Sequence, residues 1–177
     1  MSDATVVNAR IAVLVEDLFE DLELWYPVLR LREAGAEVTL VGPAEGTYRG
    51  KRGLTADPHV GVAAVSATDF DGLIVPGGYA PDRLRRNPGV LAFVKEMNDR
   101  GAVIGFLCHA GWVLASAGVL VGRRCTSFFS IRDDIVNAGA EWLDAPVVVD
   151  GNLVSSRNPG DLPQFMPAVI EALVERR

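Results

Sequence analysis

The chain has 177 residues, of which 49% are hydrophobic, so it is long enough to form one compact domain with a substantial core. It carries 17 basic and 23 acidic residues, and the resulting net charge of −6 disfavours nucleic-acid binding through a broad basic surface. No apolar run approaches the roughly 20 residues of a membrane helix, and residues 1–10 lack a secretory signal pattern. We therefore expect a cytoplasmic protein with no membrane or nucleic-acid partner.

The hydrophobic pattern predicts strands and helices that alternate along the chain. Short apolar, β-branched runs predict strands that are buried on both faces. The predicted strands are 11–15, 37–41, 71–75 and 102–107, followed by a short strand near residue 124 and a hairpin with arms 147–149 and 153–155. The predicted helices are 20–34, 88–99, 111–117, 130–138 and a last one that Asp161 caps. Residues 46–65 predict a small antiparallel excursion.

Two residues mark features of the first predicted helix. Pro27 lies inside it, which predicts an irregular start or a bend. Gly35 follows it and is expected to end it as a C-terminal cap.

This alternation predicts an α/β protein with a mostly parallel sheet and helices on both faces. No repeat or linker interrupts it, so we expect residues 1–177 to form one domain. Ligands of such sheets bind beyond the carboxyl ends of the strands. Three segments are expected to meet there, namely 16–23, 76–82 and 108–111.

Cys108 stands where a predicted buried strand runs directly into a helix. Such a turn resembles a nucleophile elbow, which holds a serine or cysteine in strained backbone. A helix N-terminus favours the thiolate over the thiol, and His109 adds a potential base. Because neighbouring residues on a sharp turn point in different directions, His109 need not touch the sulfur. The small residues Ala110 and Gly111 are expected to let the helix pack close to the strand.

Two other features point to the same site. Glu23 is flanked by Leu22, Leu24 and Trp25, so we expect it to be buried, protonated near pH 7 and within hydrogen-bonding reach of the Cys108 sulfur. Nearby acids such as Glu20 also fit compensation of the helix dipole.

The second feature is the pair Gly77–Gly78 at a strand end. Its backbone N–H groups fit either an oxyanion hole or an ordinary turn.

No cofactor is expected. The two histidines, His59 and His109, are too few for a histidine-built metal centre, and no paired-cysteine spacing of a zinc site occurs. No glycine-rich dinucleotide motif follows the first strand. Cys125 has no neighbouring base in the sequence, and we expect it to be structural.

Together these segments resemble the ThiJ/PfpI family, within the class I glutamine amidotransferase-like superfamily, and they are most similar to its PfpI intracellular-protease branch. The resemblance covers residues 11–173 and rests on FEDLELWYP (19–27), DGLIVPGGYAPDRLR (71–85), CHAGWVLASAGVLVGRR (108–124), IRDDIVNAGAEW (131–142) and VVVDGNLVSSRNPGDLPQF (147–165). It implies a flavodoxin-like three-layer sandwich that assembles as homodimers or hexamers.

The resemblance also implies residue roles. Cys108 is implied as nucleophile with His109 beside it, Glu23 as the neighbouring acid and Glu20 as a second carboxylate. The oxyanion donors are implied at Gly78 and the backbone of His109. Asp82 occupies the position of a glutamate that a neighbouring subunit contributes in the PfpI branch, one methylene shorter.

Two substitutions distinguish this chain from the family pattern. Phe128 replaces a tyrosine near the pocket, and Ala110–Gly111 replaces the usual Gly-Pro. Loss of the tyrosine hydroxyl and the shorter Asp82 both weigh against peptidase activity.

We therefore expect a cysteine-nucleophile enzyme that acts on reactive carbonyls, as a glyoxalase or deglycase, or as a peptidase or amidase, in stress protection. The alternative is a redox-responsive stress protein or chaperone that uses an oxidisable Cys108.

Overall fold

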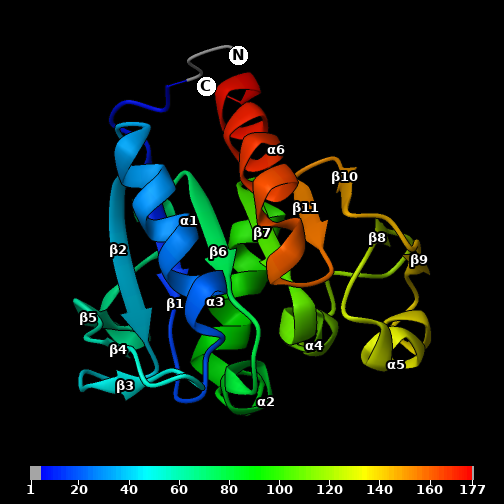
Figure 1. The fold of residues 1–177 in the computed structure, drawn as a ribbon, viewed down its shortest axis with the longest axis horizontal. Helices are drawn as coiled ribbons and strands as arrows, with labels where there is room; N and C mark the ends of the chain where they lie inside the picture. The colour runs from blue at the N-terminus through cyan, green and yellow to red at the C-terminus, as the bar shows by residue number, and fades with distance from the viewer. Residues whose placement is uncertain (1–4, 177) are drawn as a thin grey trace.

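The computed structural model describes residues 5–176 and shows a twisted central sheet between two layers of helices (Figure 1). The sheet has seven strands in the order β10-β11-β7-β6-β1-β2-β5. Their bounds are β1 Arg10–Leu14, β2 Glu37–Gly42, β5 Val60–Gly61, β6 Gly72–Val75, β7 Val103–Leu107, β10 Val147–Asp150 and β11 Leu153–Ser156. All neighbouring pairs are parallel except β10 and β11, which form the predicted hairpin. The flavodoxin-like α/β prediction is therefore confirmed.

Four helices supply most of the outer layers. They are α1 Asp21–Glu33, α3 Pro88–Asp99, α4 Gly111–Ser116 and α6 Leu162–Glu175. Helices α1 and α6 contact each other over one face, while α3 and α4 contact each other on the opposite face (Figure 1). The wholly buried strands β6 and β7 lie between these layers, which explains their uninterrupted apolar sequences.

The structure corrects the expectation for residues 46–65. Strands β3 (Tyr48–Arg49) and β4 (Thr55–Ala56) form the predicted antiparallel excursion. Strand β5, however, pairs in parallel with β2 and extends the main sheet. Among the strands and α-helices of residues 5–176, two were not predicted: α2 (Ala80–Leu84), and β9 (Glu141–Trp142), which pairs with β8 (Arg124–Cys125).

The expected helix end is found at Gly35, whereas the expected cap at Asp161 is not. Helix α1 runs unbroken through Pro27, and Gly35 follows its end with the expected positive φ of 91°. Asp161 stands at the N-cap position of α6, but its side chain does not cap the helix. Its two carboxylate oxygens instead accept hydrogen bonds from Arg157. The short helix α5 (Arg132–Asn137) agrees with the predicted segment 130–138.

The alignment of β7 with its two neighbouring strands shows where the candidate site lies. Leu107 is aligned with Ser156 of β11, and Phe106 with Val75 of β6. The residues that follow these strands therefore meet at one edge, with Cys108 in the middle. No helix within residues 5–176 has the length and apolar character needed to span a membrane.

Candidate active site

Cys108 forms a strained elbow between strand β7 and the following helix. It opens a short 3-10 turn, Cys108–Ala110, that leads into α4, and its φ is 58°. A left-handed conformation costs a non-glycine residue about 1–2 kcal/mol, so the predicted strained turn is confirmed. Gly111 has a different packing role from the one expected. A Cβ there would lie 2.6 Å from Ile135 Cδ1, so the glycine lets α4 approach α5 rather than the strand.

Glu23 projects from the first turn of α1 and is fully buried. Its Oε2 accepts a 2.8 Å hydrogen bond from the N–H of Gly77, whereas Oε1 has no hydrogen-bond partner among residues 5–176. Burial, with the nearby charge of Glu20 as the next cause, raises the pKa of Glu23 to about 8. The carboxyl is therefore mostly protonated at pH 7, as its apolar flanks predicted.

The Cys108 thiol lies against this carboxyl. A Cβ on Gly77 would be 2.5 Å from Glu23 Oε2 and 2.6 Å from Cys108 Cβ, so only a glycine lets both groups approach. A hydrogen bond between the two side chains partly offsets the effect of burial on Glu23, whose pKa it lowers. On Cys108 it acts in the same direction as burial and raises the pKa.

The expected preference for the thiolate is not found. Burial, followed by the charge of Glu23, raises the pKa of Cys108 to about 12, although the N–H groups of Gly78 and His109 lower it. The Cys108 side chain is thus a thiol at neutral pH, because desolvation outweighs the turn's two N–H donors.

His109 contacts the sulfur, which the sequence left open. Its Nδ1 is 3.2 Å from Cys108 Sγ, and its Nε2 is 3.2 Å from Ser130 Oγ. Burial lowers the pKa of His109, so its imidazole is neutral at pH 7. In the tautomer that protonates Nε2, this nitrogen donates to Ser130 while Nδ1 accepts from the thiol. The ring is held between Trp112 and Phe128, each with a centroid distance of 5.1 Å.

The two glycines have different functions. The N–H of Gly77 is occupied by Glu23, so it does not serve as the second oxyanion donor that a glycine pair would supply. Gly78 has a φ of 82°, and a Cβ there would lie 2.4 Å from the carbonyl oxygen of Leu18. Its N–H and that of His109 hydrogen-bond to the Cys108 side chain. These two groups are the donors available to an oxyanion formed beside the sulfur.

Glu20 occupies the N-cap of α1. Its Oε2 accepts hydrogen bonds from the N–H groups of Leu22 and Glu23, and its Oε1 lies 3.6 Å from Arg52 Nε. Glu20 thus anchors the helix that carries Glu23 and adds negative charge beside it. The interpretation as helix-end compensation therefore applies to Glu20.

Asp82 lies outside the Cys108 cluster within one chain. It belongs to α2, is partly exposed and forms an ion pair with Arg86. It borders a surface pocket of about 550 Å³ whose wall also includes Trp112 and Tyr79. The expectation that Asp82 acts across a subunit boundary stays a prediction.

Three residues near the site were missed. Trp112 and Ser130 hold the His109 ring, and Lys51 lies over the Tyr79 ring, 5.2 Å from its centroid. The positive charge of Lys51 lowers the pKa of both Glu23 and His109. Only Trp112 had a local signal, since it follows the elbow by one helical turn. The other two are brought in by distant loops.

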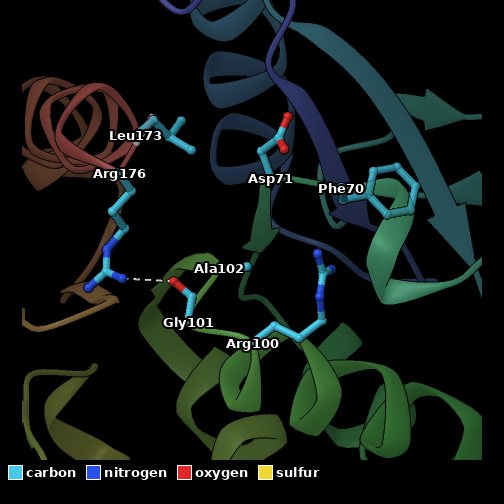
Figure 2. A pocket seen from close by; sticks show the side chains of 7 residues that line it. All are labelled: Phe70, Asp71, Arg100, Gly101, Ala102, Leu173 and Arg176. Carbon is cyan, nitrogen blue, oxygen red and sulfur yellow. Dashed lines mark hydrogen bonds between the residues drawn. The ribbon is translucent and has the colours of Figure 1, made fainter.

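A second hollow of about 390 Å³ lies at the opposite end of the sheet (Figure 2). Asp71 and Ala102 border it just before strands β6 and β7 begin, and Arg176 donates a hydrogen bond to the carbonyl of Gly101 (Figure 2). The guanidinium of Arg100 donates to the carbonyl of Ala67. Because this hollow lies at the amino ends of the strands that lead to Gly77 and Cys108, it is separate from the candidate active site.

Other proteins share this architecture. Residues 9–172 match the model of the DJ-1/PfpI family. A deglycase of Thermococcus kodakarensis is 46% identical over 164 residues, which cover 93% of this chain and 99% of that protein. A protein/nucleic acid deglycase of Escherichia coli is 40% identical over 164 residues, covering 90% of this chain and 94% of that protein.

A solved structure from Anabaena variabilis, which combines a DJ-1/ThiJ/PfpI-like domain with a ferritin-like domain, has a TM-score of 0.92 and 40% identity. The match covers 94% of this chain but 48% of that one, so the present chain spans about half of the two-domain protein. The family-model match over nearly the whole chain and the two relatives above 30% identity agree with the sequence resemblance. This chain belongs to the DJ-1/PfpI family.

Proposed function

We propose that this protein is a cysteine-dependent enzyme that adds its Cys108 thiol to reactive carbonyl compounds, with a deglycase- or glyoxalase-like activity in stress protection. The observation that carries the proposal is the strained elbow, where the Cys108 sulfur lies 3.2 Å from the neutral imidazole of His109. Two relatives named deglycases, at 46% and 40% identity, support the substrate class.

The proposed first step is addition to a carbonyl. The thiol proton moves to His109 Nδ1 as the sulfur attacks the carbonyl carbon, so that an S–C bond forms and the C=O π bond breaks. The new oxyanion accepts hydrogen bonds from the N–H groups of Gly78 and His109. The protonated Glu23 then gives its proton to this oxygen. The product of the step is a hemithioacetal, with the thiol proton on His109.

Proteolysis has less support than carbonyl chemistry. Asp82 is engaged by Arg86, and Phe128 has no hydroxyl to donate a hydrogen bond. The redox-sensor alternative requires a low-pKa, accessible thiolate. Because burial raises the pKa of Cys108 to about 12, no feature of the site favours that alternative.

The setting of the enzyme is part of the proposal. We propose that residues 1–177 act as one domain in the cytoplasm, without a cofactor and as a homodimer or hexamer. Exposed apolar side chains of Leu22, Tyr26 and Leu29 lie along one side of α1 and support self-association. A neighbouring subunit would then bring Asp82 to the site.

The test measures consumption of methylglyoxal, release of methylglyoxal adducts from N-acetyl-lysine and cleavage of a fluorogenic peptide, using wild type, Cys108→Ala and Cys125→Ala in parallel. Cys125 is the matched control because it is the other free cysteine of residues 5–176 and is fully buried in β8. We expect Cys108→Ala alone to lose activity toward the carbonyl substrates. Equal rates for wild type and Cys108→Ala would refute the assignment.

A further inference from the structure

The order of the sheet places two different pockets beside Cys108. Strand β7, which leads to Cys108, lies between β6 and β11. On the β6 side lies the pocket of about 550 Å³ that Tyr79 and Trp112 line. On the β11 side lies a pocket of about 320 Å³, here called the aromatic pocket, which is lined by Ser127, Phe128, Phe129, Trp142, Asp144, Arg157 and Asn158. The imidazole of His109 stands between the two, against Trp112 on one side and Phe128 on the other.

The aromatic pocket adjoins the candidate active site through Phe128, whose ring lies between the pocket and His109. The Phe128 ring stacks on His109, and the N–H of Phe128 donates a 3.1 Å hydrogen bond to the carbonyl of Cys108. Phe129 packs on Phe128 with a ring distance of 4.8 Å, yet 71% of it is exposed. The indole N–H of Trp142 donates to Ser127 Oγ at 3.0 Å, which fixes this wall. A group bound in the pocket would therefore lie one aromatic ring away from His109.

The charges around the aromatic pocket are already paired. Arg157 binds Asp144 at 2.7 Å and Asp161 at 2.9 Å. The guanidinium of Arg132 lies 5.5 Å from the centre of the Trp142 ring. A charged ligand would have to compete with these contacts, whereas an apolar group would lose little by leaving water.

One polar group remains for a ligand. Asn158 Oδ1 accepts a hydrogen bond from the N–H of Gly160, but its side-chain NH₂ group makes no hydrogen bond within residues 5–176. It is thus a donor for an amide carbonyl next to an apolar side chain. Apolar and aromatic walls with few polar groups are typical of ligand pockets, and an amide donor beside such walls matches a peptide unit with an apolar side chain.

We propose that the aromatic pocket is a substrate subsite for an uncharged aromatic or aliphatic side chain, so that the site takes peptide-sized substrates lying across His109. This inference rests on the proposed function, because it assigns the part of the substrate that lies beyond the reacting carbon. Free dicarbonyls would fill the space at Cys108 alone and leave the aromatic pocket empty.

The test compares the rates at which iodoacetamide and N-(2-phenylethyl)iodoacetamide alkylate Cys108, each normalised to its rate with free N-acetylcysteine. Peptide mass spectrometry assigns the product to Cys108. In each reaction a sulfur–carbon bond forms as the carbon–iodine bond breaks; iodide leaves, the thiol proton passes to His109 or to solvent, and turnover is not required. We expect wild type to prefer the phenylethyl reagent by about tenfold, the effect of burying part of an aromatic side chain.

Three variants locate this preference. Phe129→Ala should reduce it to about twofold, and Phe129→Leu, which keeps an apolar wall, should retain an intermediate value. Val136→Ala is the matched control, because Val136 is also an exposed apolar residue of this segment but does not line the pocket. An equal preference in wild type and Phe129→Ala, or an equal loss in Val136→Ala, overturns the proposal.

A non-covalent measurement separates this inference from the proposed function. In Cys108→Ala, N-acetylphenylalaninamide should shift the Trp142 indole N–H resonance, whereas N-acetylglycinamide should leave it in place. If neither alkylating reagent modifies wild-type Cys108, the proposed function fails and this shift alone decides the subsite. If the two amides have the same effect on Trp142, the subsite proposal is wrong, whatever the reactivity of Cys108.

Discussion

Replacing Glu23 with glutamine should change the way stability depends on pH. Burial raises the pKa of Glu23 from 4.5 to about 8, so between these values the folded protein holds a proton that the unfolded chain has released. This contribution to stability is fully present below pH 4.5 and is lost as pH rises through 8. At 1.36 kcal/mol per pKa unit, it amounts to about 4 kcal/mol between pH 5 and pH 8.

Glutamine cannot ionise, so Glu23→Gln lacks this pH-dependent contribution to the free energy of unfolding. Its amide can still hydrogen-bond to the sulfur. The difference in unfolding free energy, wild type minus variant, should fall by about 4 kcal/mol between pH 5 and pH 8. Urea unfolding at pH 5, 6, 7 and 8 measures it. Glu33→Gln is the control, since Glu33 ends the same helix in solvent. If the wild-type-minus-variant difference in unfolding free energy changes with pH as little for Glu23→Gln as for Glu33→Gln, Glu23 is ionised in the folded state.

Three other changes test the geometry around the sulfur. His109→Ala should lower carbonyl-substrate turnover about 100-fold or more, the range for loss of a general base; turnover equal to that of wild type would mean that His109 is not the base. Cys108→Gly should be about 1 kcal/mol more stable in urea than Cys108→Ala, because glycine relieves the positive φ; equal stabilities would mean that the elbow relaxes. Gly78→Ala should cost about 3 kcal/mol, since its Cβ would strike the Leu18 carbonyl; a near-neutral urea result would contradict that contact.

The central elements could be predicted because their signals are local. Buried parallel strands have uninterrupted apolar sequences, and the strand ending at Leu107 gave the position of the elbow directly. The burial of Glu23 was also predictable, since a carboxyl surrounded by apolar residues on a helix facing the sheet has no route to solvent. These features depend on side chains only a few residues apart.

The remaining features depend on tertiary contacts. Strand β5 has two residues, too few for any periodicity, and it joins the sheet only because β2 offers an edge. Ser130 reaches His109 through a loop that starts beyond α4, and nothing in its own neighbourhood marks it. The pKa of Cys108 was misjudged for the same reason. The sequence shows a strand-to-helix turn, but the depth to which that turn is buried depends on the surrounding elements.

The raised pKa values lead to a specific order of proton transfers. Glu23 and Cys108 share one buried site, and burial, the largest cause of the raised pKa, keeps Cys108 a thiol at neutral pH. A resting thiolate would need the low pKa that burial prevents, so in the proposed mechanism the sulfur loses its proton as it attacks. In the proposed mechanism His109 accepts this proton, because its imidazole is neutral and its Nδ1 lies 3.2 Å from Sγ. Glu23 stays protonated at pH 7 because it is buried, and the proposed mechanism therefore assigns it as the acid toward the new oxyanion. One buried site thus holds an acid and a base in opposite protonation states at the same pH.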